Sequence, residues 1–312
     1  MLTTGGVTVR RIARGLTLVE LTVALSLAGL VLAIITGIAV RQQRIFGDLA
    51  QVTSLEAQLR EAVTVLPIDM RAIAPSLGDL RDARDTAIEF RATIGTAIVC
   101  DTSADRLILY PAPSGGVGAT GATRYSSFPT PIAAGDTAWL LSVSDTSERW
   151  VPYAIRAVGS VAAGECADVA PALDSAARGK SRLTITLAAA ESVAVGMPVR
   201  FTRPVRYSLY HASDGEWYLG ERDWNAATAR FNTIQPVAGP FLSAPLNGMR
   251  ISYFDTSGAV LPLPIVDLSA VGGASITVHG QTRGPVRAIG AGPVSGRRVD
   301  SASVVIAFRG AR

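Results

Sequence analysis

The sequence predicts an α+β fold, in which a long N-terminal α-helix packs on an antiparallel β-sheet and the sheet region carries an additional β-rich insert. Three patterns predict it: an apolar run from Leu16 to Val40, a helical apolar stripe that continues to Leu66, and short alternating segments after about Thr86. The chain has 312 residues, of which 48% are hydrophobic and 17% charged. It can therefore bury a substantial core and does not have the composition of a disordered protein.

The first 40 residues combine a basic leader with a segment long enough to cross a membrane. The leader has no acidic residue and three arginines, Arg10, Arg11 and Arg14, which favours a cytoplasmic N-terminus. From residue 16 to residue 40 only Glu20 is charged. These roughly 25 residues would extend ~37 Å as a helix, more than the ~30 Å hydrocarbon core of a bilayer. A carboxylate inside such a segment is costly, which indicates that Glu20 has a function.

The helical pattern continues beyond the membrane segment. Apolar residues recur at spacings of three and four, which line one face of a helix: Ile45, Leu49, Val52, Leu55, Leu59, Ala62, Val63 and Leu66. Pro67 is expected to end the helix, because proline cannot donate the helical hydrogen bond. The predicted helix covers residues 16–66, and its second half needs a sheet or domain to cover the apolar stripe.

After Pro67 the sequence changes character, and Pro75 and Gly78 mark a boundary. Alternating segments separated by Gly, Pro, Ser and Asp then predict antiparallel strands at residues 106–110, 137–143, 150–158, 183–187, 199–209, 216–219, 249–254, 274–279 and 303–308. We divide the part of the chain after the helix into two regions, with the boundary near residue 200. Residues 67–200 then form a linker and a β-rich inserted module, and residues 201–312 form a C-terminal antiparallel sheet.

The run Gly15-Leu16-Thr17-Leu18-Val19-Glu20, after a short basic leader and before an apolar helix, resembles the class III signal of type IV pilins and type II secretion pseudopilins. The resemblance implies that a prepilin peptidase removes residues 1–15 by cutting between Gly15 and Leu16, and that it methylates Leu16. Leu16 stands where the family most often has Phe. Glu20 would be the fifth residue of the processed chain, placed to pair with the charged N-terminal amine of a neighbouring subunit.

The C-terminal part has a looser resemblance to the same superfamily. Residues 205–223, with Tyr207-Ser208-Leu209-Tyr210 and then Trp217-Tyr218-Leu219, look like the strand pair of PilW-like minor pilins. Residues 248–258 resemble the strand that follows, and residues 301–308 would close the sheet. Residues 90–200 resemble nothing that we recognise.

The resemblance implies a minor pilin or pseudopilin that assembles into, or initiates, a type IV pilus-like filament. Its partners would be the prepilin peptidase, other pilin or pseudopilin subunits, the inner-membrane assembly platform and, before assembly, membrane lipid. Its location would be the inner membrane as a single-pass protein with a cytoplasmic N-terminus, and then a periplasm-spanning or cell-surface filament. The alternative within the same class is a J-like minor pseudopilin of type II secretion, which shares the signal, the helix and the sheet.

Other readings of the N-terminus explain less. A secretory signal cut near Ser26-Leu27-Ala28 would place Glu20 inside its apolar region, and a plain membrane anchor gives Glu20 no use. An anchored surface-binding or adhesive β protein is the alternative from another class, and its leader would remain attached.

The remaining residues give no indication of catalysis or of nucleic-acid binding. The chain has 29 basic and 25 acidic residues, and without the three leader arginines it has 26 and 25. This net charge gives no indication of nucleic-acid binding. Two cysteines, Cys100 and Cys166, could form a disulfide, and no clustering of Cys or His indicates a metal. Gly116, Gly118 and Gly121 match a dinucleotide pattern but lack a βαβ context. The two histidines, His211 and His279, have no catalytic partner spacing. We expect no enzyme activity and no cofactor.

Overall fold

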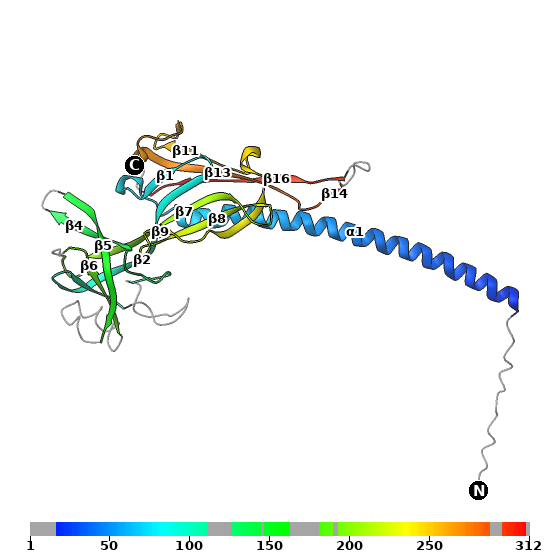
Figure 1. Cartoon of the computed structure of the whole chain (residues 1–312), viewed down its shortest axis with the longest axis horizontal. Coiled ribbons are helices and arrows are strands. Elements are labelled where there is room, and N and C mark those ends of the chain that lie inside the picture. Colours follow the sequence, from blue (N-terminus) through cyan, green and yellow to red (C-terminus); the bar gives the residue numbers. More distant parts are fainter. Residues whose placement is uncertain are drawn as a thin grey trace, which may run out of the picture.

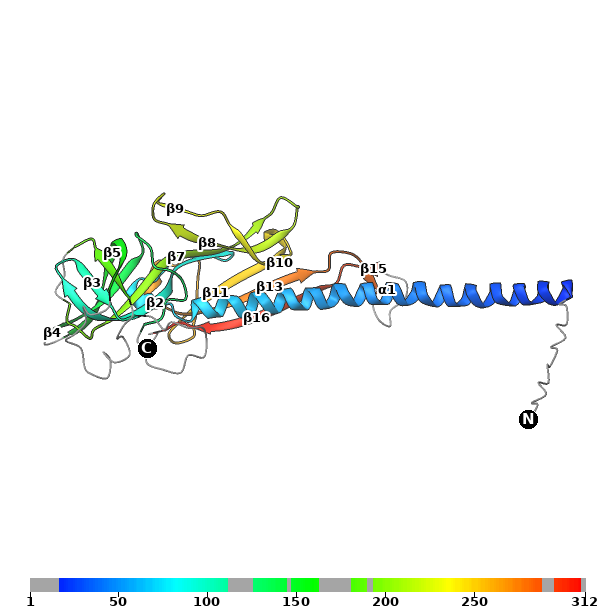
Figure 2. The same cartoon turned by 90° about the horizontal axis from the view of Figure 1, so that it is seen from below.

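The computed structural model describes residues 17–111, 126–144, 147–162, 181–189, 193–287 and 295–309. One long helix, α1 (Leu18–Met70), packs with its second half on a large antiparallel β-sheet, and its first half projects away from the folded body (Figures 1 and 2). The fold is therefore α+β, as the sequence predicts. The strands are β1 (Leu80–Ala83), β2 (Ala87–Ser103), β3 (Arg106–Leu109), β4 (Thr137–Ser144), β5 (Ser147–Val161), β6 (Arg182–Leu187), β7 (Pro198–His211), β8 (Trp217–Asn225), β9 (Arg230–Phe231), β10 (Gln235–Phe241), β11 (Met249–Asp255), β12 (Val260–Leu261), β13 (Val271–Gln281), β14 (Val286–Arg287), β15 (Ser295–Gly296) and β16 (Val299–Ala307). Three short 3₁₀ turns cover Pro75–Leu77, Ala244–Leu246 and Leu268–Ala270.

Helix α1 has 53 residues and is about 80 Å long at ~1.5 Å per residue. It ends at Met70, so the prediction that Pro67 ends it at Leu66 was wrong. Pro67 lies in the last turn, where its missing N–H removes one hydrogen bond while its carbonyl oxygen still accepts from the Arg71 N–H at 3.1 Å. Leu66, Pro67 and Met70 are all buried, and this packing holds the last turn in place.

The buried stripe of α1 begins later than the apolar pattern does. Leu55, Leu59, Ala62 and Leu66 are buried against the sheet, whereas Ile45 and Leu49 are exposed. The periodicity therefore predicted the correct face, but the body covers it only from about residue 51 onward.

Two long strands, β2 and β7, form the spine of the body. They pair antiparallel from Ala87 opposite Ser208 to Ile98 opposite Pro198. In the 14-stranded sheet of the described residues the order is β1-β2-β3-β6-β5-β4-β7-β8-β10-β13-β11-β12, with β16 on β13, β9 on β8 and β2 also on β7. The β14–β15 ladder is a separate two-stranded sheet.

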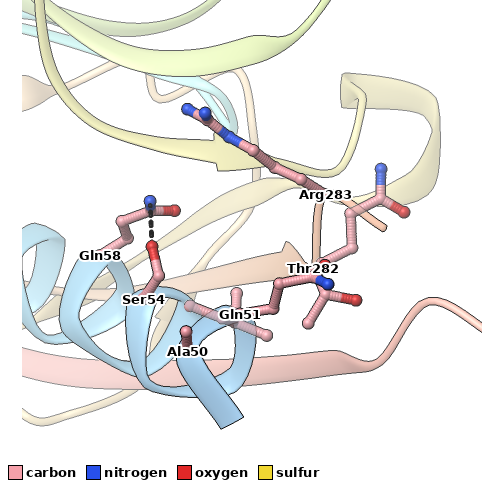
Figure 3. Close-up of a pocket in the computed structure, with 8 residues that line it drawn as sticks. Ala50, Gln51, Ser54, Gln58, Thr282 and Arg283 are labelled. Atoms are coloured by element: carbon pink, nitrogen blue, oxygen red, sulfur yellow. Dashed lines mark hydrogen bonds between the residues drawn. The ribbon is translucent and has the colours of Figure 1, made fainter. Parts of the chain in front are cut away.

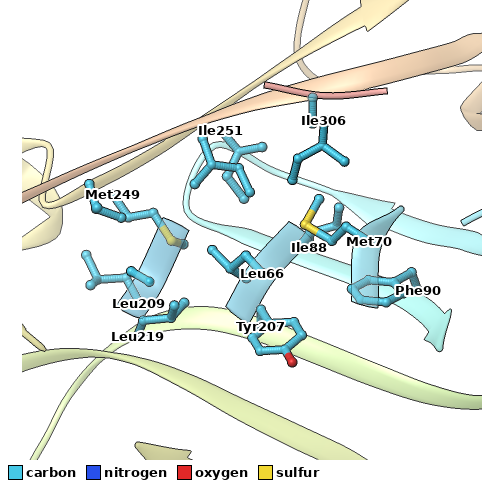
Figure 4. Packing of buried hydrophobic residues seen from close by; sticks show 14 of the residues in the cluster. Leu66, Met70, Ile88, Phe90, Tyr207, Leu209, Leu219, Met249, Ile251 and Ile306 are labelled. Carbon is cyan, nitrogen blue, oxygen red and sulfur yellow. The ribbon is translucent and has the colours of Figure 1, made fainter. Parts of the chain in front are cut away.

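The described residues form two large apolar cores along these strands, besides a small cluster around Cys100. The first lies under α1, where Leu66 and Met70 are enclosed by Tyr207, Leu209 and Leu219 on one side and by Ile251 and Ile306 on the other (Figure 4). The second is filled by side chains of β2 to β7, with these members at its centre: Val99, Leu107, Leu140, Ile185 and Phe201.

Both spine strands run through both cores. In β7, Val199 and Phe201 belong to the second core, and Val205 and Tyr207 to the first. The division that we place near residue 200 therefore falls inside β7. Residues 80–92, assigned from the sequence to the linker and insert, contribute side chains such as Leu80 to the first core.

Candidate functional site

The sole charged residue between positions 17 and 40, Glu20, lies in the first turn of α1 and caps it. The Thr17 backbone N–H and hydroxyl both donate to Glu20 Oε2, each at 3.0 Å, and the Glu20 N–H donates to Thr17 Oγ1 at 3.3 Å. This reciprocal arrangement is a capping box, and it satisfies N–H groups that a helix start otherwise leaves without partners. Glu20 Oε1 accepts no hydrogen bond from the described residues, so half of the carboxylate can accept from another molecule.

The capping box could have been found in the sequence. Thr17 followed three residues later by Glu20, directly before an apolar run, is the Ser/Thr-x-x-Glu pattern of a helix start. The sequence reasoning considered only the charge of Glu20 and so missed the role of Thr17.

The surface around Glu20 is apolar and uncovered. The most apolar 18-residue window of α1 has a mean hydropathy of 2.6 and no buried residue, so the helix is long and apolar enough to cross a membrane or to act as a signal. Its hydroxyl groups bond within the helix: Ser26 Oγ donates to the Thr22 carbonyl and Thr36 Oγ1 to the Leu32 carbonyl, both at 2.8 Å. Such internal bonds lower the cost of placing hydroxyl groups in lipid or among apolar helices.

The two glycines of this half do not interrupt the helix. At Gly29 and at Gly37 an added Cβ would meet no other atom within 4 Å, so nothing in the described residues requires glycine there. Small residues in an apolar helix allow a second helix to approach closely, and we expect these positions to serve contacts with other chains.

The second half of α1 is fixed to the sheet by polar contacts as well as by the first core. Tyr207 on β7 donates its hydroxyl to Asp69 Oδ2 at 2.6 Å. Burial, and then the nearby Asp69 carboxylate, raise the pKa of Tyr207, so the phenol stays protonated and remains a donor. Glu221 on β8 pairs in register with Tyr207, and burial followed by the Asp69 charge raises the pKa of Glu221.

A buried ion pair joins the end of α1 to the spine. The Asp79 side chain is fully buried, and its Oδ2 accepts from Arg200 Nη2 and from the Ala74 N–H, both at 2.8 Å. Arg200, on β7, also donates to the Ala72 carbonyl at 3.3 Å and to Thr93 Oγ1 on β2 at 2.9 Å. The guanidinium thus connects the segment after α1 with both long strands where the two cores meet.

Comparison of the chain with protein-family models, with curated proteins and with solved structures gave no match. The functional reading therefore depends on the residues and their geometry.

Several predicted site residues lie outside the described part of the chain. These are the leader arginines Arg10, Arg11 and Arg14, the cleavage pair Gly15 and Leu16, and Cys166. Cleavage and methylation stay predictions. Cys100 is buried on β2 beside Ile108 and Tyr110, and its pairing with Cys166 also stays a prediction.

The residues considered for catalysis or metal binding have structural contacts. His211 packs against Trp217 with ring centroids 5.3 Å apart, and His279 Nδ1 lies 2.8 Å from the Asn247 carbonyl oxygen. The described residues contain no group of three or more Asp, Glu, His or Cys arranged to hold a metal ion. The glycine-rich run 116–121 lies outside them.

Proposed function

We propose that this protein is a minor pilin or pseudopilin: a subunit held in the inner membrane by α1, processed by prepilin peptidase at Gly15, and then moved into a type IV pilus-like filament. The observation that carries the proposal is the form of α1. Its exposed apolar half continues without a break into a half whose apolar face is buried against a sheet, and its one charged residue before position 41 lies in the first turn.

Assembly moves the apolar half of α1 from lipid to a bundle of other helices. Lipid tails and apolar side chains are about equally apolar, so this transfer has little hydrophobic driving force and depends on packing and polar pairing. Cleavage would create a positive amine on Leu16, and in an apolar bundle that charge needs a partner. Glu20 can supply it, because Thr17 occupies one carboxylate oxygen and leaves the other one open.

The size of the body favours a minor or initiating subunit. A second core built on β2 to β7 extends the body beyond the part that covers α1. A repeating subunit must pack closely on all sides, and such a bulky extension limits lateral packing. The same core is what favours the second candidate, an anchored surface-binding protein whose β module contacts a ligand.

Variants at positions 20 and 17 test the pairing role. Glu20→Gln keeps a capping side chain, since Gln serves at this position of a capping box, but removes the negative charge. Thr17→Ala removes the cap and keeps the charge. We expect Glu20→Gln and Glu20→Ala to be processed and yet to be depleted from sheared filaments, and Thr17→Ala to assemble. Normal incorporation of Glu20→Gln would show that capping suffices and that the charge pairing is wrong.

A further inference from the structure

Four exposed arginines surround α1 where the body begins. Two are on the helix just after its apolar run, one is on β14, and one directly follows β15. We call them the basic collar: Arg41, Arg44, Arg287 and Arg297. Figures 1 and 2 place β14 and β15 at the end of the body that is nearest to the projecting half of α1.

The β14–β15 segment is attached to α1 by polar contacts. The Gly284 N–H donates to Gln51 Oε1 at 2.7 Å, and the Arg287 N–H lies 3.4 Å from Asp48 Oδ2. The Arg298 N–H donates to Thr282 Oγ1 at 3.0 Å, which ties the returning strand to the same point. Gln51 and Thr282 both line a groove of about 270 Å³ between the helix and this segment. Figure 3 shows the two side chains close together. These contacts hold Arg287 beside the helix, and the bond from the Arg298 N–H keeps the neighbouring Arg297 on the same segment.

The charges of the collar form no ion pairs within the described part of the chain. None of its four guanidinium groups forms an ion pair with another described residue, whereas the neighbouring Arg298 pairs with Asp300 at 3.3 Å. Asp48 is the one other carboxylate within residues 41–51 and 282–300. Without the leader arginines the chain has 26 basic and 25 acidic residues, a net charge of +1. Four of its positive charges are in the collar, so the rest of the chain has a net charge of −3.

The position of the collar matches the height of lipid headgroups. If the apolar run ends at the outer edge of the hydrocarbon core, Arg41 lies at that edge and Asp48 lies ~10 Å above it, at about 1.5 Å per residue. The headgroup layer is roughly 5–8 Å thick on each side, and charges act over a Debye length of about 8 Å at physiological salt. Arg287, attached at Asp48, is therefore within reach of headgroup charge.

We infer that the basic collar binds the anionic headgroups of the membrane leaflet through which α1 emerges, and so seats the body on that surface before the subunit is withdrawn into a filament. The inference rests on the membrane-spanning part of the proposed function. It adds a lipid class, phospholipids with net negative charge, and a body segment, the β14–β15 ladder, that recognises it.

Lipid selectivity of the full chain in bilayers tests the inference. The chain is reconstituted in phosphatidylcholine bilayers that contain a trace of spin-labelled phosphatidylcholine or phosphatidylglycerol. Electron spin resonance then gives the fraction of each labelled lipid that the protein restrains. Each arginine near an anionic surface can contribute up to about fivefold, so we expect phosphatidylglycerol to be preferred roughly fivefold or more. The preference should fall toward one in about 0.5 M salt, where the charges are screened.

The double variant Arg287→Gln/Arg297→Gln should lower this preference at least about twofold, because each replaced charge contributes up to about fivefold. The matched control is Arg230→Gln, an exposed arginine on β9 at a different part of the body, and it should leave the preference unchanged. Equal restraint of both lipids, insensitivity to salt, or an unchanged preference in the double variant would each overturn the inference. Failure of the proposed membrane span is distinguishable, because neither lipid would then be restrained.

Discussion

Replacing Arg200 by Met should strongly destabilise the body, because the substitution leaves Asp79 as a buried charge without its partner. Arg200 is 13% exposed at its side chain and Asp79 is 0% exposed. After the substitution, the Ala74 N–H is the one described donor that remains on the Asp79 carboxylate. Breaking a buried pair in this way typically costs about 3–5 kcal/mol.

The loss also includes the other hydrogen bonds of the guanidinium. Arg200 donates to the Ala72 carbonyl and to Thr93 Oγ1, at about 1 kcal/mol each. Met cannot donate a hydrogen bond, so both acceptors lose this partner.

Urea unfolding of the full chain in detergent, followed by tryptophan fluorescence, measures the free energy of unfolding at pH 7. Arg298→Met is the matched control, since the exposed pair of Arg298 with Asp300 should contribute at most about 1 kcal/mol. Adding Asp79→Asn to Arg200→Met should recover much of the loss, because the charge is gone. A loss below ~1 kcal/mol, or no recovery on adding Asp79→Asn, would refute the reasoning.

Three further predictions concern the buried face of α1, a half-buried carboxylate and the cysteines. Leu66→Ala should lower the free energy of unfolding in urea by about 2–5 kcal/mol. Ile68→Ala, at an exposed position of the same turn, should change it by less than ~0.5 kcal/mol. Equal effects would contradict the packing described. Because burial raises the pKa of Glu221, its contribution to stability falls as pH rises above the ordinary value of 4.5. Glu221→Gln should therefore raise the melting temperature at pH 7 and have little effect near pH 4, and a lower melting temperature at pH 7 would count against this. We expect Cys100 and Cys166 to be bonded, so alkylation of the unfolded chain should change its mass only after the chain has been reduced. A mass change on alkylation without reduction would exclude the bond.

The sequence predicted most of the fold because much of it is locally coded. Helix α1 follows from apolar spacing, and each expected strand after residue 100 overlaps a strand of the structure, as residues 137–143 do with β4. No strand was predicted at the position of β2, for a physical reason. Its buried positions alternate from Ile88 to Ile94, and then a register shift between Thr93 and Gly95 changes the phase. Gly95 is needed there, because an added Cβ would lie 2.8 Å from the Phe128 ring.

The candidate site was predictable where it is local and not where it depends on distant residues. Thr17 and Glu20 are three residues apart, and their capping box can be read from the sequence. Asp79 and Arg200 are 121 residues apart, and no sequence pattern joins them. The basic collar likewise unites residues near position 44 with residues near position 290, and it forms only because Gln51 and Asp48 hold the later segment.

The N-terminus of the mature chain tests the central proposal most directly. Mass spectrometry of the N-terminal peptide is to be carried out on the protein from membranes of cells that contain a prepilin peptidase. We expect a chain that begins at Leu16 and carries one added methyl group on its amine. A chain that retains Met1, or one that begins just after Ala28, would contradict the proposed processing and the filament role that depends on it.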